Sequence, residues 1–213
     1  MTGWTTHDGR AIALDRESVD TDQLIPARFM STPRSEGYCR FLLHDLRFDP
    51  DGSPVPDFPL NRHPNASILA SRRNFGSGSS REAAVYALVD YGFRAVIAPS
   101  FGDIFASNAV NNGLLPARVD DVDPLMAALG TGTAQARADL STQTVTIGPL
   151  TVPFHIDPVW RQKLINGWDD IDLTLAHRDD IAAFRATRAA AAPWAIPNDN
   201  NGDRGPAPSQ GGQ

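Results

Sequence analysis

The segment best suited to chemistry is a glycine- and serine-rich loop that runs directly into a helix. Residues 74–93 read NFGSGSSREAAVYALVDYGF, with Ser79 and Ser80 adjacent and Arg81 directly after them. Free N–H groups at a helix start bind anions, and an arginine holds a carboxylate through two parallel hydrogen bonds. The two glycines before the serines allow the backbone to bend sharply or to approach a ligand. The loop therefore predicts a site for a small carboxylate beside two hydroxyl groups.

The same loop has other interpretations. Ser79 and Glu82 are three residues apart, which is the spacing of a capping box, so Ser79 could serve only to cap the helix. A nucleotide-binding loop is excluded, because it needs Gly-Lys-Ser or Gly-Lys-Thr and the only lysine is Lys163. A dinucleotide fingerprint would require glycine where Arg81 stands. A helix cap and a carboxylate site thus remain open.

The elements around this loop alternate between short apolar runs and helical spacing. We expect strands at 66–71 and 94–100 and extended chain at 113–119, with helices from about Ser80 to Tyr91 and within 102–113. Gly92 is placed to end the first of these helices. This alternation is typical of an α/β fold with parallel strand pairing.

The flanking segments are less regular. We expect a short strand at 11–14, irregular chain over 29–65 because of its many prolines and glycines, and a hairpin that turns at Gly148-Pro149. A short helix is expected at 123–130, and the last helix lies within 169–190. We predict one domain over residues 1–196 and a disordered tail over 197–213, which contains almost nothing apolar.

Composition restricts the class of protein. The chain has 213 residues, 41% of them hydrophobic, and a formal net charge of −6, which suits an ordinary globular protein and disfavours non-specific nucleic-acid binding. No signal peptide and no apolar run of about 18 residues is present, so we expect a soluble, cytoplasmic protein. Cys39 is the single cysteine and the histidines have no metal-ligand spacing. We therefore predict no metal site in this chain.

Several longer segments then resemble a known family. The runs DTDQLIPARF, NFGSGSSRE, DYGFRAVIAPSFGDIFASNAVNNGLLP and LINGWDDIDLTLAH are similar, in order and spacing, to the small subunits of 3-isopropylmalate dehydratase. The resemblance covers about residues 9–194. It implies the swivelling β/β/α domain of the aconitase superfamily, and the isomerisation of 2-isopropylmalate and 3-isopropylmalate through dehydration and rehydration in leucine biosynthesis.

The resemblance also implies a partner and roles for particular residues. A large subunit would carry an iron–sulfur cluster of the 4Fe-4S type, and this chain would close the active site. Ser79 would be the base that removes a proton from carbon, and Ser80 and Arg81 would orient a substrate carboxylate. Asp22 would lie in a loop lining the cleft. The stretch 28–38 would be the substrate-recognition loop, in which Arg28 and Arg34 are candidates for binding a second carboxylate.

Two positions depart from the family pattern. Ser77 stands where a cysteine is common, and Ala83 stands where a histidine is usual. The core GSSRE is retained, so we expect catalysis to be retained as well. The alternatives are a small subunit of a paralogous hydratase acting on a citramalate, benzylmalate or homocitrate type of substrate, and a stand-alone carboxylate-binding domain.

Overall fold

The computed structural model describes residues 2–195. The chain forms two compact units, of which the first is Met1–Ile171 and the second begins at Asp172. The expected tail, 197–213, lies outside the described residues. The domain boundary at residue 196 and the disorder of the tail stay predictions.

Within residues 2–195, seven strands form one sheet in the order β4-β3-β2-β1-β5-β6-β7. The strands are β1 (Thr6–Leu14), β2 (Ala66–Ser71), β3 (Ala95–Ala98), β4 (Leu115–Arg118), β5 (Thr133–Asp139), β6 (Thr144–Ile147) and β7 (Leu150–Pro153). The four on the β4 side run parallel, and β5 to β7 continue the sheet antiparallel. The mixed α/β fold, the strand at 66–71 and the hairpin at Gly148 are confirmed.

Two features of the sheet differ from the sequence-based expectation. β1 begins at Thr6 rather than at Ala11, and most of it pairs antiparallel with β5, from Thr6 opposite Asp139 to Ile12 opposite Thr133. The sequence THDGR is polar, so no apolar alternation indicated a strand there. Pairing with a distant partner strand forms it instead, since β propensity depends strongly on context.

The longer helices of the first unit connect or cover the strands. They are α4 (Glu82–Tyr91), α5 (Asp103–Asn111), α6 (Asp123–Leu129) and α7 (Pro158–Asn166). The predicted helix over 123–130 is confirmed as α6. Because α4 joins β2 to β3 and α5 joins β3 to β4, the loops that precede both helices leave the same edge of the parallel sheet. That edge is where ligands bind in open α/β sheets.

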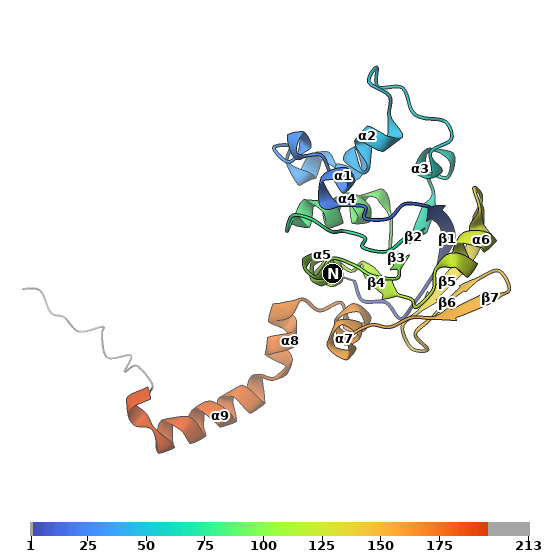
Figure 1. Cartoon of the computed structure of the whole chain (residues 1–213). Helices are drawn as coiled ribbons and strands as arrows, with labels where there is room; N and C mark the ends of the chain where they lie inside the picture. The colour runs from blue at the N-terminus through green and yellow to red at the C-terminus, as the bar shows by residue number, and fades with distance from the viewer. Residues whose placement is uncertain (1, 196–213) are drawn as a thin grey trace, which may run out of the picture. The chain divides into compact units, whose positions relative to one another are not determined.

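The core has two parts, one on each side of the parallel strands. In β1, Ile12 and Leu14 belong to the cluster with α4, whereas Ala11 and Ala13 belong to the cluster with α6 and α7. Successive side chains of a strand point to opposite faces, so β1 is buried on both. In Figure 1, α1, α2 and α4 are grouped on one side of these strands.

The region from residue 20 to 65, which includes the stretch 29–65 that was expected to be irregular, carries several short helical turns. These are α1 (Thr21–Leu24), α2 (His44–Arg47) and α3 (Pro59–Arg62), with 3₁₀ turns at Ala27–Phe29, Arg34–Glu36 and Tyr38–Phe41. Leu42, Leu43 and Leu60 of this region are fully buried in the α4 cluster. The region is therefore packed against the domain even though its sequence lacks periodicity.

The last helix predicted from the sequence is present as two helices, α8 (Asp170–Ala176) and α9 (Arg178–Ala191). Asp179 and Asp180 lie in the first turn of α9, as expected, where the helix dipole favours negative charge. A further 3₁₀ turn follows at Pro193–Ala195. None of the helices within residues 2–195 has the length and apolar content that crossing a membrane requires.

Candidate functional site

Three loops meet where the parallel strands end. The backbone N–H of Gly76 donates to the carbonyl of Val19 at 2.7 Å, and the N–H of Thr21 donates to that of Ser77 at 2.9 Å. On the other side, the N–H of Gly102 donates to the carbonyl of Phe75 at 2.9 Å. The glycine-serine loop after β2 thus lies between the loops after β1 and β3, and is bonded to both.

The glycines of this loop are required by its close packing. Gly76 has a φ of +71°, and a Cβ there would lie 2.2 Å from Cγ of Phe105. A Cβ on Gly102 would lie 2.5 Å from the carbonyl oxygen of Gly76. At Gly76, only glycine tolerates both the left-handed backbone and this lack of space. The first turn of α5 is therefore packed directly onto the glycine-serine loop.

The helix after the loop starts later than predicted. α4 begins at Glu82, with Arg81 as its N-cap residue and no side-chain hydrogen bond at the cap. Ser79 lies two residues before the cap, so the capping-box interpretation is wrong. The loop keeps its own conformation through Gly78, whose φ is +96°, and this separates the serines from the helix. The hydroxyl of Ser79 is consequently not used to start α4.

Ser79 instead faces the start of the next helix. It lines a pocket of about 190 Å³ together with three glycines and the first turn of α5; the lining residues are Gly76, Gly78, Ser79, Gly102, Asp103, Ile104 and Phe105. Gly102 is the N-cap of α5 and offers no side-chain cap, and the first N–H groups of a helix have no acceptor within it. We expected these groups to come from α4; the helix start in this pocket belongs to α5.

The other members of the serine motif are placed around this pocket. Ser80 is exposed and follows Ser79 in the same loop. The side chain of Arg81 is only 20% exposed and forms an ion pair with Asp22, which is 56% exposed. Asp22 lies in α1, so the structure brings together the two segments that sequence reasoning had linked. Arg81 already holds a carboxylate of its own chain.

Arg28 and Arg34 lie in the predicted recognition stretch, and each is paired with a carboxylate as well. Arg28 forms an ion pair with Asp45, and this guanidinium holds the pKa of the Asp45 carboxyl below its usual range. Arg34 contacts Asp90 at 2.9 Å, and its guanidinium stacks 3.8 Å above the ring of Tyr86. Neither arginine lines the Ser79 pocket.

The two residues that depart from the family pattern, Ser77 and Ala83, do not line the pocket. Ser77 is half-buried and pairs with Asp20 in a short parallel bridge. Ala83 is half-buried on the first turn of α4 and packs against the core. Ser77 therefore helps to join the glycine-serine loop to the loop after β1, whereas Ala83 belongs to the packing of α4.

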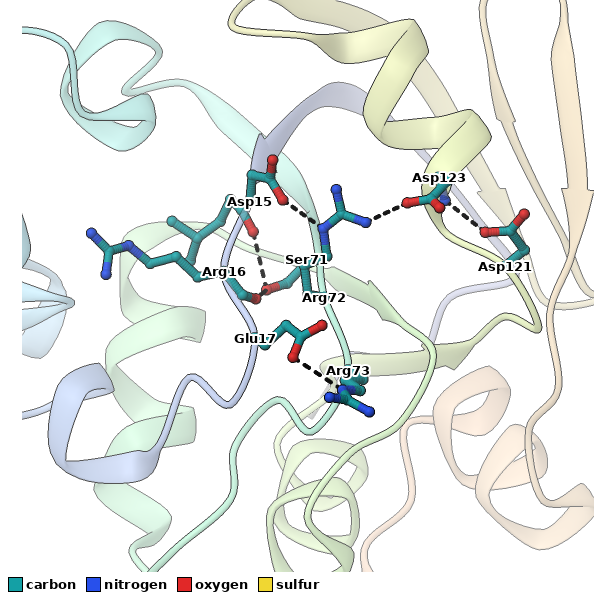
Figure 2. A network of polar contacts seen from close by, with 9 residues as sticks. Asp15, Arg16, Glu17, Ser71, Arg72, Arg73, Asp121 and Asp123 are labelled. Carbon is teal, nitrogen blue, oxygen red and sulfur yellow. Dashed lines mark hydrogen bonds and ion pairs between the residues drawn. The ribbon is translucent and has the colours of Figure 1, made fainter.

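A polar network braces the ends of β1 and β2 behind the loop (Figure 2). Arg72 bridges Asp15, at 2.5 Å, and Asp123 at the start of α6. The hydroxyl of Ser71, which is fully buried, donates to the carbonyls of Leu14 and Arg16, both at 3.2 Å. Ion pairing with Arg72 lowers the pKa of Asp15. The network fixes the point from which the loops after β1 and β2 leave the sheet.

Three parts of the structure that hold or line the candidate site were not predicted as such from the sequence. Thr21 donates from its hydroxyl to the carbonyl of Ser79 at 2.9 Å. Asn112, at the end of α5, donates to the carboxylate of Glu82 at 3.0 Å and so ties α5 to the start of α4. The first turn of α5 lines the pocket itself. The sequence did signal two of them: Asn112 as a candidate for capping a helix or lining the cleft, and α5 through a glycine followed by an acidic residue at the helix start.

A metal site in this chain would need several donor side chains close together. No group of three or more His, Cys, Asp or Glu side chains within residues 2–195 could hold a metal ion. Cys39 is half-buried in a 3₁₀ turn. An iron–sulfur cluster needs several thiolates, so the residues described here do not fit one.

Comparison with known proteins gives consistent matches. Residues 1–122 match the family described as the aconitase C-terminal domain, and residues 170–197 match the C-terminal domain of the 3-isopropylmalate dehydratase small subunit. The 3-isopropylmalate dehydratase small subunit of Bacillus pumilus is 48% identical over 89% of this chain and 98% of its own length. That of Caulobacter vibrioides is 44% identical over 91% and 98%. The crystal structure of 3-isopropylmalate dehydratase (leuD) from Methanocaldococcus jannaschii superimposes with a TM-score of 0.62 at 25% identity, covering 84% of this chain and 99% of that one.

Proposed function

The chain belongs to the family of 3-isopropylmalate dehydratase small subunits, and from this premise we propose that it joins a large subunit to interconvert 2-isopropylmalate and 3-isopropylmalate by dehydration and rehydration in the cytoplasm. The observation that carries the proposal is the pocket shared by Ser79 and the uncapped start of α5. It places a hydroxyl beside backbone N–H groups, in the loop that also bears Arg81.

Ser79 acts as the base that takes a proton from the substrate carbon. A neutral hydroxyl is a very poor base, so the reacting form must have alkoxide character. Fixed N–H dipoles stabilise developing negative charge without having to reorganise. The start of α5 supplies such groups, and the helix dipole adds to them. The exposed Asp103 on the pocket wall opposes them, so a substrate would have to displace its side chain toward solvent.

Arg81 binds a substrate carboxylate by exchanging it for the carboxylate of Asp22. The exchange conserves a charge-assisted ion pair, since one carboxylate replaces another on the same guanidinium. Asp22 then holds Arg81 in place in the absence of substrate, and Ser80 supplies a neighbouring hydroxyl. A second carboxylate bound by Arg28 or Arg34 would need the same exchange with Asp45 or Asp90.

The proposal is completed by a 4Fe-4S cluster held on the large subunit, because the described residues of this chain offer no site for it. Such a cluster supplies an electrophilic iron for the hydroxyl that leaves. The contribution of this chain is confined to proton transfer, carboxylate binding and closure of the pocket.

The test compares Ser79→Ala with Ser80→Ala in the enzyme assembled with its large subunit. Ser80→Ala is the comparison variant, since Ser80 is the adjacent serine and does not line the pocket, and its proposed part in carboxylate binding should affect KM rather than kcat. Loss of a general base typically lowers turnover by about 10²–10⁴-fold, so kcat should fall by at least that factor in Ser79→Ala and far less in Ser80→Ala. Both variants should keep the wild-type melting temperature.

Substrates for this assay should include 2-isopropylmalate, citramalate, benzylmalate and homocitrate, so that the substituted malate used is identified at the same time. A Ser79→Ala enzyme with kcat close to wild type would overturn the assignment of the base. A wild-type complex that converts none of the isopropylmalates would overturn the proposed reaction.

A further inference from the structure

A larger pocket, of about 550 Å³, adjoins the one that contains Ser79. It lies between the first turns of α5 and α7, at the ends of β3 and β4, and Asp103 lines both pockets. Its wall includes the basic side chains of Arg118 and His155 and the aromatic rings of Phe101 and Trp160. The proposed reaction gives none of these four side chains a role.

The basic side of this pocket is held in place by the backbone. The N–H of His155 donates to the carbonyl of Arg118 at 2.7 Å, and the N–H of Arg118 donates to the carbonyl of His155 at 3.3 Å. This bridge links the last residue of β4 to the loop before α7. The hydrogen bonds therefore fix the backbone positions from which the side chains of Arg118 and His155 extend.

The guanidinium of Arg118 differs in its surroundings from those of the three arginines that the sequence indicated as candidates for binding a carboxylate. Arg81, Arg28 and Arg34 each form an ion pair with a carboxylate of this chain. For Arg118, no carboxylate of residues 2–195 lies within ion-pair distance. A cation in a partly enclosed pocket without a partner favours an anionic ligand.

Three acidic residues lie on or near the wall of this pocket, and none of them forms an ion pair with Arg118. Asp157 uses its carboxylate to cap α7, accepting from the N–H groups of Val159 at 2.8 Å and Trp160 at 3.2 Å. Asp120 pairs with His155 at 3.3 Å. Asp103 lies on the wall shared with the Ser79 pocket and is exposed to solvent.

We propose that this pocket binds the carboxylate of a small apolar acid, with Arg118 as the ligand of the carboxylate and Trp160 and Phe101 against the apolar part. A pocket of this size suits a small molecule, and apolar walls with a few polar groups are typical of such sites. The acid is either the substrate itself, reaching across from the Ser79 pocket, or a separate molecule. If the acid is the substrate, this inference rests on the proposed function. If the acid is a separate molecule, the inference is independent of that function.

The binding test uses isovalerate, a branched monocarboxylate, titrated into the full chain while the indole N–H resonances are followed by NMR. The Trp160 resonance, assigned with Trp160→Phe, should shift saturably in the wild type. Arg118→Gln should weaken binding at least tenfold, and Arg118→Lys should weaken it less. Arg94→Gln is the matched control, because Arg94 is also exposed but precedes β3 at the opposite edge of the sheet.

Steady-state kinetics of the assembled enzyme then separate the two sources. If the pocket binds the substrate, Arg118→Gln should raise KM at least tenfold and leave kcat unchanged. Isovalerate should then inhibit the wild-type enzyme in competition with the substrate. An unchanged KM with non-competitive isovalerate assigns the pocket to a separate acid. The NMR titration measures binding and does not need an active enzyme. An inactive wild-type complex would therefore refute the proposed function but would leave the proposal of a carboxylate site at Arg118 intact.

Three results would overturn the proposal: no isovalerate shift in the wild type, equal binding by Arg118→Gln, or failure of Arg118→Gln to assemble with the large subunit. The last would assign Arg118 to the contact between subunits. Arg118 is exposed, so its replacement should not unfold the chain, and the melting temperature of each variant confirms that the loss is local.

Discussion

Thr21 holds Ser79 from the neighbouring loop: its hydroxyl donates to the Ser79 carbonyl at 2.9 Å, and its own N–H donates to the carbonyl of Ser77, also at 2.9 Å. Thr21 is only 1% exposed. One residue of α1 therefore fixes both ends of the Ser77–Ser79 segment. We expect Thr21→Val to keep the volume but to release the Ser79 carbonyl, lowering kcat of the assembled enzyme and costing about 1 kcal/mol of stability.

Thr21→Ser is the matched control for this prediction, because it retains the hydroxyl and loses only a methyl group. Its kcat should lie near that of the wild type, although its stability should fall slightly. The measurements are steady-state kinetics and urea unfolding of all three proteins. Equal loss of kcat in both variants would show that packing of the methyl group, and not the hydrogen bond, positions Ser79.

Gly76→Ala tests the contact between the glycine-serine loop and α5. The Cβ would meet the Phe105 ring, and the backbone at φ +71° disfavours any residue but glycine. We expect a loss of about 2–4 kcal/mol, since strain from overpacking adds to the cost of the backbone conformation. Thermal and urea unfolding measure it.

Gly52→Ala separates the two causes. Gly52 has a similar φ, +84°, but nothing lies within 4 Å of its Cβ position. Its substitution should cost only the backbone part, about 1 kcal/mol. If the two variants lose the same stability, the Phe105 contact does not restrain the loop.

The sequence predicted those parts of the fold whose signal is local. The fully apolar run at 66–71 became β2, and the turn at Gly148 became a hairpin. β5 was missed because TAQARAD alternates weakly, and its strand depends on pairing with β1, more than 120 residues away. Long-range pairing of this kind leaves little trace in a short window of sequence.

The candidate site shows the same division. The glycine-serine loop was found from its composition, but the helix that faces Ser79 was assigned wrongly. A capping box is a local pattern, and the spacing of Ser79 and Glu82 satisfied it. In the structure the conformation of the loop is set by the packing of Gly76 on Phe105, and not by a capping box, because contacts with α5 fix the loop. No local pattern indicated that Thr21 would hold the serine.

Arg81→Lys tests the proposed carboxylate site. The ammonium group of lysine cannot reproduce two parallel hydrogen bonds, and hydrogen bonds to charged groups contribute about 1.5–3 kcal/mol. We therefore expect KM to rise by about 10–100-fold, with a smaller effect on kcat. Arg73→Lys is the matched control: Arg73 lies in the same loop and pairs with Glu17 at 3.1 Å, but is 70% exposed. An equal rise of KM in both would refute the role of Arg81.

His7 predicts a pH dependence of stability. Burial lowers the pKa of His7 and the nearby charge of Arg94 lowers it further; its Nε2 lies 2.8 Å from the hydroxyl of Ser67. The unfolded chain then takes up a proton first, so stability is full above the unfolded pKa of about 6.5 and declines as the pH falls through the folded pKa. Urea midpoints from pH 7.5 to 5 should decline in the wild type and less in His7→Gln. Identical slopes would contradict the assignment to His7.

Lys163, the only lysine, tests how the start of α8 is anchored. It is 3% exposed, and its ammonium donates to Asn111 and, at 2.6 Å, to Asp170, whose carboxylate is 74% exposed. Lys163 lowers the pKa of Asp170, so this stabilisation is present above pH about 4 and is lost as the pH falls through the folded pKa. Breaking a buried pair costs about 3–5 kcal/mol, but water screens this carboxylate.

For Asp170→Asn we therefore expect a loss of about 1–3 kcal/mol at pH 7, because a buried cation remains without its counter-charge. In a Lys163→Met background the same substitution should cost little, since methionine leaves no charge to balance. The double-mutant cycle isolates the pair from the other contacts of Asp170. Additive losses at pH 7 would show that Asp170 stabilises the chain without Lys163. Coupling that stays constant while NMR shows the Asp170 carboxylate of the folded chain becoming protonated would show that the interaction does not depend on the carboxylate charge.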